Sequence, residues 1–298
     1  MTLKISSGIK KRPYFIVIYG ADGCGKTTFA SDAPSCLVVG PEQGSAHLNV
    51  SRADDINSWN DVLSAIDFLS KEKHNFKTVA LDSLDWIEQL LVKHICEEDR
   101  VDTISDAKGG YGKGYEYAVS KWVELIKSLE QLRDKGMNVI AIAHAQVKTF
   151  NDPNQALPYD RYMLKLNDKA AAKWREAVDV VGFANFEDTV FKLNKTDKKA
   201  KASGGEVRKL YTERRAAFDA KNRLGLPAEL ALSWAEFDRL ASIGQPDSLE
   251  NIESDLKAIM ETLPKETSDK MKLAIEKANK DVNQLIKIRN YARTIGEV

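Results

Sequence analysis

The feature that most restricts the fold is an apolar run followed at once by a glycine-rich loop. Residues 14–19 read YFIVIY and residues 20–27 read GADGCGKT, which matches the pattern G-x-x-x-x-G-K-[ST]. This pattern predicts a buried strand, a loop whose backbone N–H groups converge on phosphate, and a helix that adds its positive dipole end. The residues expected to bind nucleotide phosphates are Gly20, Ala21, Asp22, Gly23, Cys24, Gly25, Lys26, Thr27 and Thr28.

Two side chains of the loop have specific expected roles towards ATP and Mg²⁺. Lys26 should reach the β- and γ-phosphates, and the Thr27 hydroxyl should hold Mg²⁺. A carboxylate at the end of another strand completes such a metal site, and Asp82 directly follows the apolar residues 78–81. Asp85, one helical turn later, is either a second acidic group of the site or an ordinary first-turn residue, and the second interpretation is favoured.

Hydrolysis of ATP also requires a group that orients or deprotonates water. Glu42 follows the apolar residues 36–39 and is the candidate for that role. His144 and Gln146 follow the apolar residues 139–143 and are candidates for sensing the γ-phosphate through hydrogen bonds. The carboxyl ends of parallel strands meet at one edge of a sheet, so we expect these side chains beside the loop.

The spacing of the apolar runs predicts an α/β fold with a mostly parallel sheet flanked by helices. Runs with little alternation suit strands that are covered on both faces, and helical patterns separate them. The expected strands are residues 14–19, 36–39, 78–81, 139–143 and 178–183, and the expected helices are residues 58–69, 84–96 and 115–135. This alternation is typical of a doubly wound domain.

The chain changes character after residue 183. Two short apolar runs flank a lysine-rich segment, residues 194–205, that ends in two glycines and predicts an antiparallel hairpin with a long tip. Further on, apolar residues fall at helical spacing with no strand signal. The predicted organisation is a nucleotide-binding domain over residues 1–245 and a small helical tail over residues 246–298.

Composition excludes a global positive field that would attract nucleic acid. The 44 Lys and Arg residues equal the 44 Asp and Glu residues in number, so any DNA contact needs a local basic patch. Three cysteines (Cys24, Cys36 and Cys96) predict no disulfide framework, and no signal peptide or long apolar stretch is present in the sequence, so we expect a soluble cytoplasmic protein. Cys24 lies in the loop before a helix, which predicts a reactive thiol of lowered pKa.

One motif favours a different nucleotide. Residues 194–197 read NKTD, which matches the N-K-x-D pattern with which GTPases recognise guanine. Those proteins also carry D-x-x-G after the strand that ends in the metal-binding aspartate, whereas residues 82–85 read DSLD. A GTPase is therefore kept as the third hypothesis.

Three further motifs accompany these residues: GGYGKGY at 109–115, YDRY at 159–162 and AKNRLGLP at 220–227. Glu42 after the second strand, the Asp82–Ser83 pair and the polar residues His144 and Gln146 resemble the RecA-like branch of P-loop ATPases, and the three motifs carry a narrower resemblance. More narrowly, the chain resembles phage-encoded AAA-type proteins grouped with RecA-like single-strand-annealing ATPases. The resemblance covers residues 12–240, and it departs from RecA at His144, which stands in place of a glutamine.

The resemblance implies single-stranded DNA as an effector, bound by two loops. The matching regions, residues 100–117 and 147–162, mix rings that stack on bases with cations that meet phosphates. The candidate DNA-binding residues are Lys108, Tyr111, Lys113, Tyr115, Lys148, Phe150, Tyr159, Arg161 and Tyr162. Ordinary loops with some buried tyrosines are the alternative, which the zero net charge favours.

The resemblance also implies a homo-oligomeric ring or filament, in which a cation from the neighbouring subunit completes each site. Lys221 and Arg223 are the candidates, and a solvated basic helix end is the alternative. The first hypothesis is a Mg²⁺-dependent ATPase of phage-type DNA recombination or replication in the host-cell cytoplasm, with a single-strand-binding or other recombination protein as a partner. The second is an ATP-dependent assembly switch that binds a protein partner with little turnover.

Overall fold

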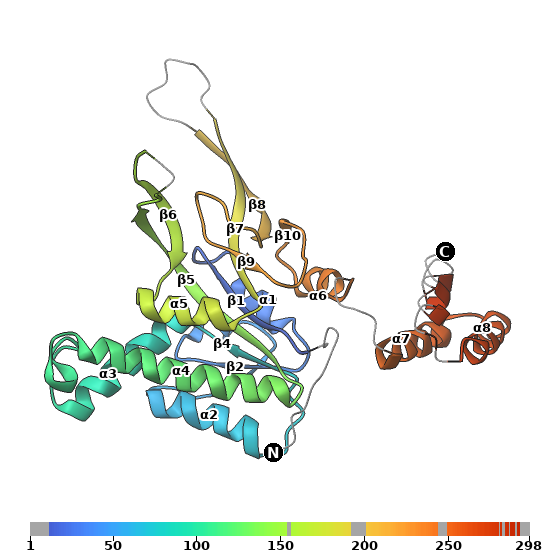
Figure 1. The fold of residues 1–298 in the computed structure, drawn as a ribbon, viewed down its shortest axis with the longest axis horizontal. Helices are drawn as coiled ribbons and strands as arrows, with labels where there is room; N and C mark the ends of the chain where they lie inside the picture. The colour runs from blue at the N-terminus through green and yellow to red at the C-terminus, as the bar shows by residue number, and fades with distance from the viewer. Residues whose placement is uncertain are drawn as a thin grey trace. The chain divides into compact units, whose positions relative to one another are not determined.

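A ten-stranded sheet organises the larger unit of the chain (Figure 1). The computed structural model describes residues 12–153, 156–191, 201–243 and 249–279, together with 281, 284–285, 287–289 and 291–292. These residues belong to two compact units, one over residues 12–243 and one from residue 249 onwards. The NKTD motif at 194–197 lies outside the described residues.

Six neighbouring strands of the sheet are parallel, which confirms the prediction of a mixed α/β fold with a mostly parallel sheet. In spatial order they are β7 (Val180–Phe191), β1 (Phe15–Gly20), β5 (Asn138–Phe150), β4 (Thr78–Leu81), β2 (Cys36–Val39) and β3 (Ser51–Arg52). Antiparallel pairs add β8 (Lys201–Tyr211), β10 (Glu229–Ala231), β9 (Lys221–Asn222) and β6 (Tyr159–Leu164).

The central strands are apolar because helices cover both faces of the sheet, and every residue of β1 is buried. One face packs against α2 (Trp59–Lys71), α3 (Leu84–Asp99), α4 (Lys113–Asp134) and α5 (Asp168–Ala177). The other packs against α1 (Lys26–Ser31) and α6 (Trp234–Ile243). Two short 3₁₀ segments are η1 (Gln43–Ser45) and η2 (Ala107–Gly109).

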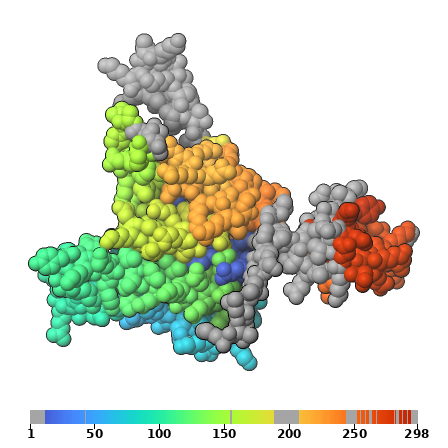
Figure 2. Space-filling view, viewed as in Figure 1, coloured from blue at the N-terminus to red at the C-terminus, as the bar shows by residue number. Residues whose placement is uncertain are grey.

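Two hairpins extend beyond the end of β1. Its last residue, Gly20, pairs with His144 of β5 on one side and with Ala184 of β7 on the other. Both neighbours continue past this level, β5 to pair with β6 and β7 to pair with β8. Figure 2 shows the β5–β6 hairpin, in yellow-green, projecting from the helical layer. The loop after β1 therefore begins between the bases of two hairpins.

The β7–β8 hairpin differs from the sequence prediction. β7 runs without a break from Val180 to Phe191, with a bulge between Phe186 and Asp188, whereas the predicted strand ended at residue 183. β8 already begins at Lys201, so Gly204 pairs with Asp188 inside the ladder rather than forming the tip. Glycines usually interrupt a strand, but a bulged antiparallel pair accommodates them.

The unit from residue 249 onwards contains the helices α7 (Leu249–Thr262) and α8 (Lys265–Lys277). Its own apolar cluster consists of Ile252, Leu256, Met271, Ala278, Leu285 and Ala292. Within the described parts of both units, no helix has the length and apolar character needed to cross a membrane.

Candidate nucleotide-binding site

The loop over residues 20–25 depends on glycine at specific positions. Gly23 and Gly25 have φ values of 70° and 100°, in the left-handed region that other residues rarely adopt. Gly20 passes so close to β7 that a β-carbon there would lie 1.9 Å from the carbonyl oxygen of Ala184. The glycines therefore allow the backbone of the loop to turn tightly over the end of the sheet.

Lys26 is buried at the base of this loop. Its Nζ donates hydrogen bonds to the carbonyl oxygens of Gly20, at 3.1 Å, and Ala21, at 2.7 Å. The loop encloses a cavity of about 280 Å³, which is lined by Gly23, Gly25, Lys26, Thr27, Thr28, Glu42, Gly44, His47, Asp82, His144 and Arg208. The lysine therefore presents a cation to the same space as the loop and the strand-end carboxylates.

Thr27 and Asp82 meet across this cavity. The Thr27 hydroxyl donates a hydrogen bond of 2.8 Å to Oδ2 of Asp82, whose residue is 2% exposed. Burial raises the pKa of Asp82 to about 6, against the lowering effect of the Thr27 hydrogen bond. A buried carboxylate that is costly to ionise, next to a hydroxyl, fits Mg²⁺, because a divalent cation would stabilise the ionised form.

Glu42 reaches the cavity from the segment after β2. Its Oε2 accepts a hydrogen bond of 2.9 Å from the Ser83 hydroxyl, and its Oε1 lies 3.8 Å from Nε2 of His144. Gly40 allows this approach, because a β-carbon there would lie 1.9 Å from the carbonyl oxygen of Asp82. The ends of β2 and β4 are thus close enough to place both carboxylates in one cavity.

His144 is held by Asp85, which the sequence analysis interpreted as an ordinary first-turn residue. Asp85 Oδ2 lies 2.9 Å from the ring Nδ1, and its Oδ1 accepts the backbone N–H of His144 at 3.1 Å. That interpretation was wrong, since the Asp85 side chain is only 3% exposed and bridges α3 to β5. The hydrogen bond that the ring donates to Asp85 raises the pKa of His144, whose Nε2 faces the cavity.

Three residues that line the cavity were not expected from the sequence: Gly44, His47 and Arg208. Arg208 is the permanent cation among them. It lies on β8, opposite Phe186 in the ladder, and its side chain extends over Gly25. The sequence around Arg208 does not predict a place in the cavity, because basic residues are common at solvent-facing positions of strands. Only the pairing of β8 with β7 brings it to the loop.

The structure does not bring Gln146 into the cavity. Its Nε2 donates to the carbonyl oxygens of Leu164, at 2.8 Å, and Leu166, at 3.4 Å. The amide therefore binds the end of β6 and the segment that follows it. The expectation that Gln146 senses the γ-phosphate finds no support in this arrangement, because these two carbonyl oxygens engage its amide and the residue does not line the cavity.

Lys221 and Arg223 bind the end of a helix in their own chain. Lys221 Nζ donates to the carbonyl oxygens of Glu176 and Val178, and Arg223 donates to the same two carbonyls. Cations at this position satisfy the last carbonyl groups of α5 and complement its dipole. Their side chains therefore stabilise the fold locally, which accounts for both cations without a neighbouring subunit.

Two of the candidate DNA-binding cations, Lys108 and Arg161, already interact with groups of their own chain. Lys108 forms ion pairs of 2.8 Å with Glu98 and Asp99, and its Nζ lies 4.3 Å from the ring centre of Tyr117. Arg161 is 3% exposed and donates to the carbonyl oxygen of Phe218. The expectation that Arg161 contacts DNA is corrected, because its guanidinium is buried between β6 and the chain around residue 218.

The other candidates in the β5–β6 hairpin have intramolecular partners at its surface. Lys148 pairs with Asp168 at 2.6 Å. The ring of Phe150 packs edge-on against Tyr159, with centroids 5.8 Å apart, and Tyr162 stacks on Phe183 at 5.2 Å. These aromatic contacts stabilise the hairpin.

In the α3–α4 connection, three candidates point outwards. Tyr111 is fully exposed, Lys113 is exposed, and Tyr115 is 40% exposed. Figure 1 shows this connection apart from the tip of the β5–β6 hairpin. The two predicted DNA-binding regions therefore do not form one continuous surface within a single chain.

Cys24 differs from its expected reactivity. The side chain is buried and packs in the apolar cluster with Ile18 and Phe29. Burial raises the pKa of the Cys24 thiol, and the nearby Lys26 charge only partly opposes this effect. The expected lowering of the Cys24 pKa was therefore wrong, because burial outweighs the nearby positive charge.

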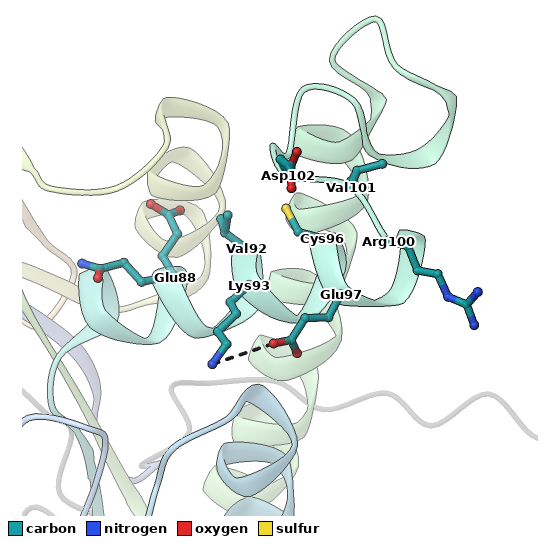
Figure 3. A pocket seen from close by; sticks show the side chains of 9 residues that line it. Glu88, Val92, Lys93, Cys96, Glu97, Arg100, Val101 and Asp102 are labelled. Carbon is teal, nitrogen blue, oxygen red and sulfur yellow. Dashed lines mark ion pairs between the residues drawn. The ribbon is translucent and has the colours of Figure 1, made fainter.

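A larger cavity of about 650 Å³ lies along α3, away from the loop (Figure 3). It is lined by Glu88, Gln89, Val92, Lys93, Cys96, Glu97, Arg100, Val101 and Asp102. Lys93 and Glu97 face each other across one helical turn, 3.8 Å apart. The side chains are those of an ordinary charged helix surface, and no residue of the phosphate loop contributes.

Comparison with known proteins places the chain in a family. A search of curated proteins found no significant match. A family model described as an AAA domain matches residues 12–224, which is more than half of the chain. The matched region contains the loop and the cavity residues from Lys26 to Arg208. The chain therefore belongs to the AAA domain family of nucleotide-binding P-loop ATPases.

Proposed function

We propose that the protein is a Mg²⁺-dependent ATPase of the RecA-like type that acts on single-stranded DNA. One observation carries the ATPase part: the Glu42 carboxylate lies in the same cavity as Lys26 and the Thr27–Asp82 pair. A site that only binds nucleotide needs Lys26, Thr27 and Asp82 but not Glu42. A carboxylate opposite the phosphate loop adds a base for water.

In the proposed reaction, Lys26 binds the β- and γ-phosphates in place of its present carbonyl partners. Thr27 and Asp82 would hold Mg²⁺, which withdraws negative charge from the phosphates when bound. Glu42 accepts a proton from water as the water oxygen bonds to the γ-phosphorus and the bond to the β-phosphate oxygen breaks. The Ser83 hydroxyl orients Glu42 for this step through its hydrogen bond to Oε2.

His144 has a separate proposed role at the γ-phosphate. Asp85 holds Nδ1 and favours the protonated ring, so Nε2–H is directed into the cavity as a donor. The residues of β5 that follow His144 pair with β6, so a γ-phosphate bound at Nε2 of His144 would contact the base of the β5–β6 hairpin. This connection supports a DNA response that depends on ATP.

For the DNA site we retain Tyr111, Lys113 and Tyr115 in the α3–α4 connection, with Lys148 and Phe150 on the hairpin. An assembly of several copies, as a ring or filament, would bring such separate regions of neighbouring chains onto one strand. The competing function, an ATP-dependent switch for a protein partner, is favoured by the internal ion pairs of Lys108 and by the zero net charge.

The decisive experiment measures phosphate release from ATP with and without single-stranded DNA, with GTP as a control. We expect Mg²⁺-dependent turnover of ATP that DNA increases and that Lys26→Ala abolishes. Preference for GTP would instead favour the NKTD motif. Tight ATP binding without turnover at any DNA concentration would favour the switch.

DNA binding is tested separately by fluorescence anisotropy with a labelled oligonucleotide and a non-hydrolysable ATP analogue. Replacing Tyr111 and Lys113 by alanine should weaken DNA binding and leave ATP affinity unchanged. The matched control replaces Phe68 and Lys71, an exposed ring and cation on α2, and should have no effect. Absence of binding by the wild type at low salt would contradict the DNA proposal.

A further inference from the structure

Arg208 is placed against the phosphate loop in the same chain. A β-carbon on Gly25 would lie 2.9 Å from Nη1 and 3.5 Å from Cδ of Arg208, so the absence of a side chain at Gly25 leaves room for the arginine. On its other side, the guanidinium carbon lies 5.7 Å from the ring centre of Phe186, the residue opposite it in the β7–β8 ladder. The side chain is thus positioned by both the loop and the hairpin.

These contacts position the Arg208 side chain but, within the described part of the chain, leave its charge without a counterion. Among the residues that the structure describes, none forms a hydrogen bond or an ion pair with the Arg208 guanidinium. Its neighbour on β8, Lys209, is different, because it points to the opposite side of the strand and pairs with Glu187 at 2.7 Å and Glu229 at 3.1 Å. Of these two neighbouring cations of β8, Lys209 therefore has carboxylate partners, and Arg208 is directed at the cavity without any among the described residues.

The charges of the cavity favour an anion beside Arg208. Lys26 is the other permanent cation in the cavity lining, and both are directed at the same space. The Asp82 and Glu42 carboxylates of the same lining accept hydrogen bonds from Thr27 and Ser83 and form no ion pair with Arg208. An anion in the cavity would therefore be attracted by both cations and by the converging N–H groups of the loop. A guanidinium also matches the geometry of phosphate oxygens, since it donates two parallel hydrogen bonds.

We propose that Arg208 binds a phosphate group of the nucleotide from within the same chain, and that this contact ties the β7–β8 hairpin to nucleotide occupancy. The proposal rests on the proposed function and adds to it a phosphate-binding residue supplied in cis. The phosphate would join the loop after β1 to β8, two segments that the covalent chain separates widely. Ligand binding would then restrain the base of the hairpin.

The test uses the full-length protein and isothermal titration with Mg-ADP and with a Mg-bound non-hydrolysable ATP analogue. Arg208→Ala should weaken binding of at least the ATP analogue by about tenfold or more, as expected for a lost charge-assisted contact. Arg208→Lys should restore part of the affinity, because it keeps the charge but not the two parallel hydrogen bonds. Lys209→Ala, which removes the same charge from the same strand, should bind within about twofold of wild type.

A second readout separates phosphate binding from a structural role. In wild type and Lys209→Ala, saturating nucleotide should slow hydrogen exchange of the β8 amides, and in Arg208→Ala it should not. Unchanged affinity of Arg208→Ala for both nucleotides would overturn the proposal while the ATPase assignment stands. Equal hairpin protection in Arg208→Ala would overturn the link to the hairpin, and no nucleotide binding by the wild type would overturn both this proposal and the proposed function.

Discussion

The pair formed by Asp85 and His144 gives a prediction whose size follows from its contacts. Asp85 accepts two hydrogen bonds from His144, one from the ring and one from the backbone N–H. Hydrogen bonds to a charged group contribute about 1.5 to 3 kcal/mol each, and Asp85 is 3% exposed, so solvent replaces them poorly. His144→Ala loses only the ring bond, whereas Asp85→Ala loses both. We therefore expect Asp85→Ala to lower the free energy of unfolding by about 3 to 6 kcal/mol and His144→Ala by about 1.5 to 3 kcal/mol.

A double-mutant cycle, measured by urea unfolding and followed by circular dichroism, isolates the ring bond. The coupling energy near pH 6 should be about 1.5 to 3 kcal/mol, since the backbone bond survives in His144→Ala. If Asp85→Ala does not fold, Asp85→Asn, which keeps the shape of the side chain, replaces it in the cycle. The exposed pair of Glu116 and Lys169, with side chains 69% and 67% exposed, is the control and should couple by less than about 1 kcal/mol.

The pH dependence of this coupling follows from the directions of the two pKa shifts. The pKa of His144 is raised above 6.5 by its bond to Asp85, so its contribution is complete below about pH 6.5 and declines as pH rises through the raised value. Burial raises the pKa of Asp85, but the His144 hydrogen bonds outweigh this and lower it below 3.8. Its contribution is present above about pH 3.8 and is lost as pH falls through the lowered value. A coupling below about 0.5 kcal/mol near pH 6, or one equally large near pH 9, would refute the charged pair.

Two further predictions concern the cavity, and a third concerns the buried Cys24. Glu42→Gln should keep nucleotide affinity and reduce turnover by at least about 100-fold, as measured by phosphate release, and unchanged turnover would show that another group activates water. Affinity for Mg-ATP, measured by titration calorimetry, should fall as pH drops below about 6, because burial raises the pKa of Asp82 to about 6 and the protonated acid does not bind Mg²⁺. Asp82→Asn should weaken binding and remove that pH dependence. The buried Cys24 should react with iodoacetamide more slowly than the partly exposed Cys96 in the folded protein, whereas faster labelling of Cys24, followed by mass spectrometry, would contradict the raised pKa of its thiol.

Local sequence patterns predicted the strands that the sheet buries completely. The expected strands at 36–39 and 78–81 coincide with β2 and β4, because a short strand covered by helices on both faces must be apolar at each position. The strands predicted at 139–143 and 178–183 end before the observed strands β5 and β7, which continue to Phe150 and Phe191. Beyond the sheet core, residues 144–150 of β5 and 185–187 of β7 are partly exposed and mix polar with apolar side chains, so the apolar run stops where the helices no longer cover the sheet.

The sequence by itself determined the loop over residues 20–27 and the carboxylates at Glu42 and Asp82, because each is defined by a motif or by the end of an adjacent apolar run. Tertiary structure decided which charged side chains have partners and which are available to a ligand. Asp85 and His144 are 59 residues apart in the chain, and Arg208 reaches Gly25 only through the pairing of β8 with β7. Arg161 and Lys221 are basic in sequence just as Arg208 is, yet they are bound to carbonyl groups of their own chain. Charge pairing is an interaction through space, so the distances between folded segments, and not the residue types, determine it.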